Sequence, residues 1–122
     1  MPFTLAWRWL LTLLLIACAP LQAGAQALQP VPALTARVID QTGTLAPADR
    51  TALEAQLAAI ESQHGSQVVV LMVATTAPED IAAFAYRVAS DWKIGRRDVG
   101  DGLLVVVAKD DRRMRIEVAR KL

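Results

Sequence analysis

The stretch Gln67-Val68-Val69-Val70-Leu71-Met72-Val73 decides the fold of this chain. It is too short for an independent helix, it is rich in β-branched residues, and it would be apolar on both faces of a strand. Such a strand is typical of the middle of a parallel sheet, where both faces are covered. The run from Leu103 to Ala108 has the same composition and predicts a second buried strand.

A helix is predicted before this central strand. Leu53, Leu57 and Ile60 recur at helical spacing in a segment that begins near Pro47 and ends at Gly65. Proline is tolerated in the first turn of a helix, and glycine is favoured just after the last turn. The segment should therefore form an amphipathic helix with one buried stripe.

A second helix is predicted between the two buried strands. Thr76 and Glu79 have the spacing of a capping box, and Pro78 would lie in the first turn. The order strand, helix, strand favours a right-handed crossover and an α/β fold. The helix should end near Gly95, and its apolar stripe comprises Ile81, Phe84, Val88 and Trp92.

Two further strands should complete the sheet. Residues 37–40 read as a short strand that stops at the turn-forming Gly43. After the polar turn 109–112, apolar and charged residues alternate, which indicates a strand with one wet face at an edge of the sheet. The apolar residues are Met114, Ile116 and Val118, and the charged residues are Arg113, Arg115 and Glu117.

The N-terminus has the pattern of a bacterial export signal. Arg8 gives a positive start, residues 9–17 are apolar except for Thr12, and Ala25-Gln26-Ala27 supplies the small residues that leader peptidase accepts. We therefore expect cleavage after Ala27 and an exported, periplasmic protein. The alternative is a lipobox, residues 15–18, in which a lipidated Cys18 would tether the protein to the membrane.

These patterns divide the chain into residues 1–27 as signal peptide, residues 28–36 as an extended linker, and residues 37–122 as one α/β domain. Loss of Arg8 with the leader would leave basic and acidic residues equal in number, which argues against generic nucleic-acid binding. Cys18 is the only cysteine, so disulfides and cysteine ligands would be absent from the mature domain. No organic cofactor is indicated.

The chemistry that remains is that of carboxylates. His64 is the only histidine, which excludes an ordinary zinc site, and no nucleophile motif or phosphate-binding loop is present. Asp40 ends a predicted strand, and Asp98 and Asp101 lie in the loop before another. Oxygen ligands of this kind suit Ca²⁺ or Mg²⁺, although aspartate is also a common turn residue. Catalytic residues stay unassigned.

The predicted topology sets a condition on this cation site. If the first three predicted strands all ran parallel, Asp40 would lie at one end of the sheet and Asp101 at the opposite end. A single site that uses both residues requires the first strand to run antiparallel.

Four segments in order resemble the TPM domain family: VIDQTGTL at 38–45, DWKIG at 91–95, GDGLLVVV at 100–107 and RMRIEV at 113–118. The resemblance implies a small α/β/α sandwich with a central mixed sheet, an exported location and, in many members, a C-terminal membrane segment. Members of the family also resemble a thylakoid-lumen protein for which divalent-cation binding and acid phosphatase activity have been proposed. By position, the aspartates of the family fall on Asp40 and Asp101.

The chain departs from the family pattern in two places. The family usually has Asp-Asp-Gly where this chain has Gly100-Asp101-Gly102, so one carboxylate is either lost or supplied by Asp98. The family also continues into helices that cover the sheet, whereas this sequence ends at Leu122 and reads as lacking them.

We therefore expect an exported TPM domain that binds a divalent cation at Asp40, Asp98 and Asp101 and acts in envelope protein interaction or quality control. Its partner would be an envelope protein, with membrane association through a missing C-terminal segment or a lipidated Cys18. The alternative is an acid phosphatase that hydrolyses phosphomonoesters with an aspartate-based site. A third reading is a structural interaction module whose edge strand, with Arg113 and Arg115, pairs with a partner.

Overall fold

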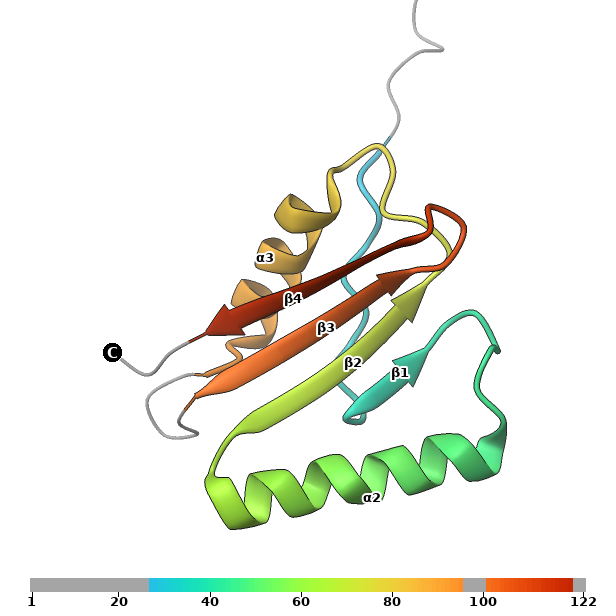
Figure 1. Cartoon of the computed structure of the whole chain (residues 1–122). Helices are drawn as coiled ribbons and strands as arrows, with labels where there is room; N and C mark the ends of the chain where they lie inside the picture. The colour runs from blue at the N-terminus through green and yellow to red at the C-terminus, as the bar shows by residue number, and fades with distance from the viewer. Residues whose placement is uncertain (1–26, 96–100, 120–122) are drawn as a thin grey trace, which may run out of the picture.

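A computed structural model describes residues 27–95 and 101–119 and shows one four-stranded mixed sheet with two helices (Figure 1). The strand order is β1-β2-β3-β4; β1, β2 and β3 run parallel, and β4 runs antiparallel to β3. The predicted α/β class and mixed sheet are therefore confirmed. The elements are β1 (Val38–Asp40), α2 (Pro47–His64), β2 (Gln67–Val73), α3 (Ile81–Trp92), β3 (Gly102–Ala108) and β4 (Arg113–Ala119).

The main core lies between α3 and one face of β2 and β3. Phe84 and Val88 of α3 are fully buried against Leu71 of β2 and Leu104 of β3. Every second residue of β2 and of β3 is buried, because alternate side chains of a strand point to the same face. The predicted stripe of α3 and the two buried strands thus account for this core.

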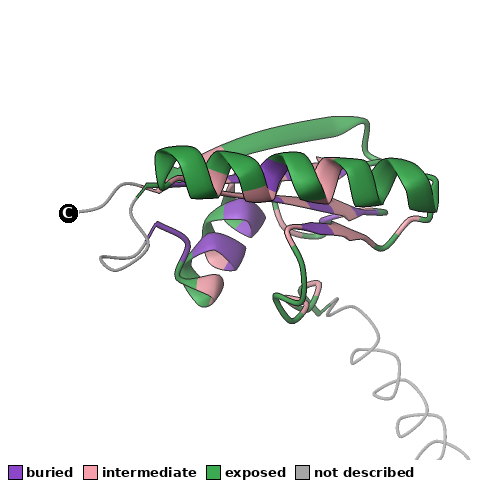
Figure 2. Cartoon of the chain, turned by 90° about the horizontal axis from the view of Figure 1, so that it is seen from below, coloured by how far each residue is buried: buried purple, intermediate pink, exposed green. Residues whose placement is uncertain are grey.

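Helix α2 covers part of the other face of the sheet. Val38 of β1 is paired in register with Val70 of β2, and both point away from the α3 core, since the neighbouring Val69 and Leu71 point into it. Leu57 is the one buried residue of α2, and Figure 2 shows that most of this helix is exposed. As predicted, the helix begins at Pro47 and ends before Gly65, which adopts a left-handed conformation.

The predicted start of the second helix was wrong. Residue Asp80, with an extended backbone, occupies the position before the first turn, and α3 begins at Ile81. The hydroxyl of Thr76 donates to the carbonyl of Glu79, and the N–H of Glu79 donates to the carbonyl of Thr76. Thr76 and Glu79 therefore close a separate turn that precedes the helix, although their spacing is that of a capping box.

Strand β4 lies at an edge of the sheet, as its alternating pattern predicts. Its apolar residues, however, do not enter a core: Met114, Ile116 and Val118 are 64%, 52% and 56% exposed. They lie on the face opposite α3, where α2 reaches only β1 and β2 among the described elements. An alternating pattern shows that a strand has two different faces, and it does not show that a second element covers the apolar one.

The segment before β1 has no regular secondary structure from residue 27 to residue 35, and it lies against α3. The indole N–H of Trp92 donates to the carbonyl of Pro32 at 2.8 Å. The guanidinium of Arg87 donates to the carbonyl of Gln29 at 2.6 Å, and Val31 packs against the core. Residues predicted as a linker are thus fixed to the domain by hydrogen bonds.

Candidate functional site

Asp40 ends β1 and organises the connection to α2. Its carboxylate accepts hydrogen bonds from the N–H and the hydroxyl of Thr42 and from the N–H of Leu45, the last at 2.8 Å. Partial burial alone would raise the pKa of Asp40, but these donors outweigh burial and lower the pKa to about 2. The carboxylate is therefore held in its charged form as a cap of this turn.

The structure separates the predicted cation ligands. Asp40 lies at the carboxyl end of the parallel strands, whereas Asp101 precedes β3 and its carbonyl accepts from the N–H of Gln67 at the opposite end. In this arrangement Asp40 and Asp101 do not share an ion. Asp98 lies outside the described residues, so a role for the loop carboxylates in cation binding stays a prediction. No group of three or more candidate metal ligands occurs within residues 27–95 and 101–119.

Close packing explains why the Asp-Gly pattern at the start of β3 has glycine at position 102. A Cβ atom at this position would overlap Cγ2 of Ile94 and would come within 2.7 Å of the backbone nitrogen of Gly95. The chain after α3 therefore passes too close to β3 for any other residue. This close approach is a sufficient explanation for the glycine, and no bound ligand is needed to explain it.

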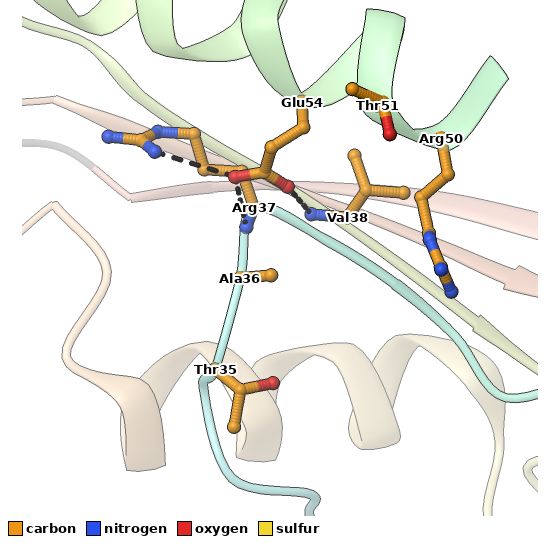
Figure 3. Close-up of a pocket in the computed structure, with 7 residues that line it drawn as sticks. All are labelled: Thr35, Ala36, Arg37, Val38, Arg50, Thr51 and Glu54. Atoms are coloured by element: carbon orange, nitrogen blue, oxygen red, sulfur yellow. Dashed lines mark hydrogen bonds and ion pairs between the residues drawn. The ribbon is translucent and has the colours of Figure 1, made fainter. Parts of the chain in front are cut away.

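Glu54 is a carboxylate that sequence reasoning missed. From α2 it accepts the backbone N–H of Arg37 at 3.0 Å and that of Val38 at 2.8 Å, as Figure 3 shows. Burial raises the pKa of Glu54, but these donors and the Arg37 guanidinium outweigh it and hold the pKa below its ordinary value. The signal was its place between Leu53 and Leu57, which puts Glu54 near the buried stripe.

An open pocket of about 390 Å³ lies between β1 and α2, lined by the residues of Figure 3. The guanidinium of Arg37 is engaged by Glu61 at 2.9 Å and by Glu54 at 3.4 Å. Arg37 thus binds Glu54 and Glu61, and Glu54 also binds the backbone at the edge of the sheet. This arrangement is that of a structural network.

Asp111 joins the β3–β4 turn to the end of β2. Its carboxylate accepts from the hydroxyl of Thr75 at 2.9 Å and from the N–H of Thr76 at 3.1 Å. The sequence identified it only as a turn residue, because its partners are 35 and 36 positions away. Asp111 therefore fixes the turn from which β4 begins.

A continuous apolar surface is formed on the side of β3 and β4 that faces away from α3. Three cross-strand pairs compose it, and we call it the β3–β4 face. The β4 members are exposed, and the β3 members are half-buried. Exposed apolar surface of this kind marks interaction sites. The pairs are Leu103 with Val118, Val105 with Ile116, and Val107 with Met114.

None of the helices in residues 27–95 and 101–119 is long and apolar enough to cross a membrane.

Comparison with known proteins agrees with this fold. The N-terminal domain of a protein from P. gingivalis, solved by solution NMR, matches with a TM-score of 0.67 and 27% sequence identity. The match covers 78% of this chain and 66% of the other, so the chain spans about two thirds of that domain. No curated protein sequence matches. A sequence model of the TPM domain matches residues 38–122, and the chain therefore belongs to the TPM domain family.

Proposed function

We propose that this TPM domain works outside the cytoplasm by binding another protein of the cell envelope rather than by catalysing a reaction. The observation that carries the proposal is strand β4, which lies at the edge of the sheet and presents Met114, Ile116 and Val118 to solvent. An edge strand with an exposed apolar side is unusual in a protein without partners, because it can pair with other chains.

The state of Asp40 supports the same proposal. Its carboxylate already accepts three hydrogen bonds that hold the turn, which leaves few of its roughly four lone-pair sites for a nucleophile or ligand role. Export is supported by residues 1–27, which have the pattern of a leader and lie mostly outside the described residues. An intact mass of the cell-derived protein that still includes residues 1–17 would contradict processing at either Ala27 or Cys18.

The interaction is tested with immobilised domain and extracts of the native envelope. A partner should be retained by the wild type and lost with Ile116→Glu, because the new charge interrupts the apolar surface. Tyr86→Ser is the matched control, since Tyr86 is 66% exposed but belongs to α3. The partner is then identified by mass spectrometry, purified, and titrated against the three proteins by calorimetry.

An equal affinity for the wild type and Ile116→Glu would count against the proposal. So would a partner that is lost with Tyr86→Ser and kept with Ile116→Glu, because it would bind the side of α3. Ile116 is 52% exposed, so its replacement should leave the fold intact, and a proton–nitrogen correlation spectrum checks this.

A second candidate is cation binding by the loop before β3, favoured by the exposed position of Asp101 and by its nearness in sequence to Asp98. Calorimetric titration with Ca²⁺ or Mg²⁺ should show binding that Asp101→Asn weakens by roughly tenfold, the usual scale for losing one charged contact. Asp110→Asn serves as the control, because Asp110 lies in the β3–β4 turn at the other end of the sheet. Absence of binding at millimolar metal would end this candidate.

The same proteins test the alternative of an acid phosphatase. Hydrolysis of p-nitrophenyl phosphate that is lost with Asp101→Asn, and kept with Asp110→Asn, would support an aspartate-based site. Hydrolysis unchanged by Asp101→Asn would remove Asp101 from that role.

A further inference from the structure

Strand β4 has seven residues, and its outer edge pairs with no other strand among residues 27–95 and 101–119. The backbone N–H and C=O groups of this edge are thus available to an added strand. Residues 113–116 and 118 are all exposed, and Glu117 is half-buried.

The start of this edge borders a groove. In Figure 1, helix α3 crosses behind β4. A pocket of about 490 Å³ at this place is lined by residues 76–81 on one side and by Asp111 and Arg113 on the other. A strand added to β4 would therefore pass this groove at the Arg113 end of the edge, as in β-strand addition.

The charged side chains of β4 that lie on the α3 side of the sheet determine which charge pattern an added strand can have. Arg113 and Arg115 come first along the strand, and Glu117 follows. Arg115 is bound to Glu117 at 3.4 Å, and the two side chains are 47% and 17% exposed. Side chains directly opposite in a sheet interact, and like charges there are destabilising. The added strand therefore needs acidic residues opposite the two arginines and a basic residue opposite Glu117.

We infer that β4 binds an extended partner segment whose alternate residues are basic, acidic and acidic in that order, with apolar residues between them. The order holds for an antiparallel strand, whose pairing is slightly more stable than parallel pairing. The intervening apolar residues would lie beside Met114, Ile116 and Val118 and extend the β3–β4 face. This inference rests on the proposed function and names the kind of partner.

Arg115 is the position that should discriminate most. At the Arg113 end, Asp80 and Asp111 also line the groove and weaken its attraction for an acidic side chain. Glu79 lies there as well, but it is paired with Arg87 at 2.9 Å. Arg115 is paired with Glu117, which the basic residue of the added strand would neutralise.

A capped synthetic peptide, Thr-Lys-Val-Glu-Val-Glu-Thr, is the probe. When the peptide is titrated into the isotope-labelled domain, the NMR signals of the outer amides of β4 should shift. These amides should also be protected from hydrogen exchange. Arg115→Glu should weaken its binding by about tenfold, because an attractive pair becomes a repulsive one. A peptide whose first glutamate is replaced by lysine should restore the binding to that variant. Arg50→Glu, an exposed arginine on α2, should leave binding unchanged.

The inference is overturned if the probe does not saturate, if it shifts the β3–β4 face without protecting amides of β4, or if Arg115→Glu has no effect. It is also overturned if the exchanged peptide does not restore binding, which would assign the loss to altered folding. If the peptide fails to bind but a natural partner is lost with Ile116→Glu, the proposed function still stands. Binding of the probe without any natural partner would instead contradict the proposed function alone.

Discussion

Replacement of Glu54 by alanine should lower the free energy of unfolding by about 2 to 3 kcal/mol, because two backbone N–H groups of the edge strand lose a charged acceptor. In the part of the chain that the structure describes, Glu54 is the acceptor for the N–H groups of both Arg37 and Val38. Val38 is only 3% exposed, so water replaces the carboxylate poorly there. Urea denaturation followed by far-ultraviolet circular dichroism measures the change.

Glu61→Ala is the matched control for this result. Glu61 binds the same arginine at 2.9 Å, but it accepts no backbone N–H, and both side chains are about one third exposed. Such a pair contributes about 0 to 1 kcal/mol. Glu54→Gln should fall between the two variants, since an amide keeps one acceptor oxygen. Equal losses for Glu54→Ala and Glu61→Ala would show that the ion pair, and not the backbone contact, supports β1.

Asp40→Asn should remove about 2 kcal/mol of stability near pH 7 and should also change how stability depends on pH. The pKa of Asp40 falls from 3.8 to about 2 on folding, so the folded protein binds its proton less readily than the unfolded chain. The stabilisation is complete above the unfolded pKa, and it is lost as the pH falls through the folded pKa. Wild type and Asp40→Asn should therefore converge in stability between about pH 5 and pH 2.

Urea titrations at a series of pH values give this difference directly. Asp110→Asn controls for the loss of one negative charge, because Asp110 is exposed in the β3–β4 turn. A constant gap between wild type and Asp40→Asn down to about pH 2 would mean that the turn does not depend on the charge of the carboxylate.

The elements of this fold could be predicted wherever a local pattern determines them. The continuous apolar runs gave β2 and β3, and helical spacing gave α2 and most of α3. The start of α3 could not be predicted, because Thr76 makes two contacts that are not those of a capping box: its hydroxyl donates to the carbonyl of Glu79, and its N–H donates to the carboxylate of Asp111. The second partner is 35 residues away and leaves no local pattern.

The candidate site was less predictable because it depends on strand direction. Asp40 and Asp101 are each close to a strand end, but only the parallel pairing of β1 with β2 shows that these ends are opposite. Glu54 and Asp111 accept hydrogen bonds from backbone N–H groups of distant segments. Almost every residue has such a group, so the sequence does not show which ones these carboxylates bind. The exposed side of β4 was misread for a related reason, since alternation does not reveal whether a neighbour covers it.

In the export that we propose, the contacts of the segment before β1 would form in a fixed order. Gln29 and Pro32 bind Arg87 and Trp92, which lie 58 and 60 residues further along the chain. In export that begins at the N-terminus, as we propose, these acceptors emerge long before their donors. The residues next to the expected cleavage site would therefore stay undocked, and accessible to a membrane peptidase, until α3 had crossed.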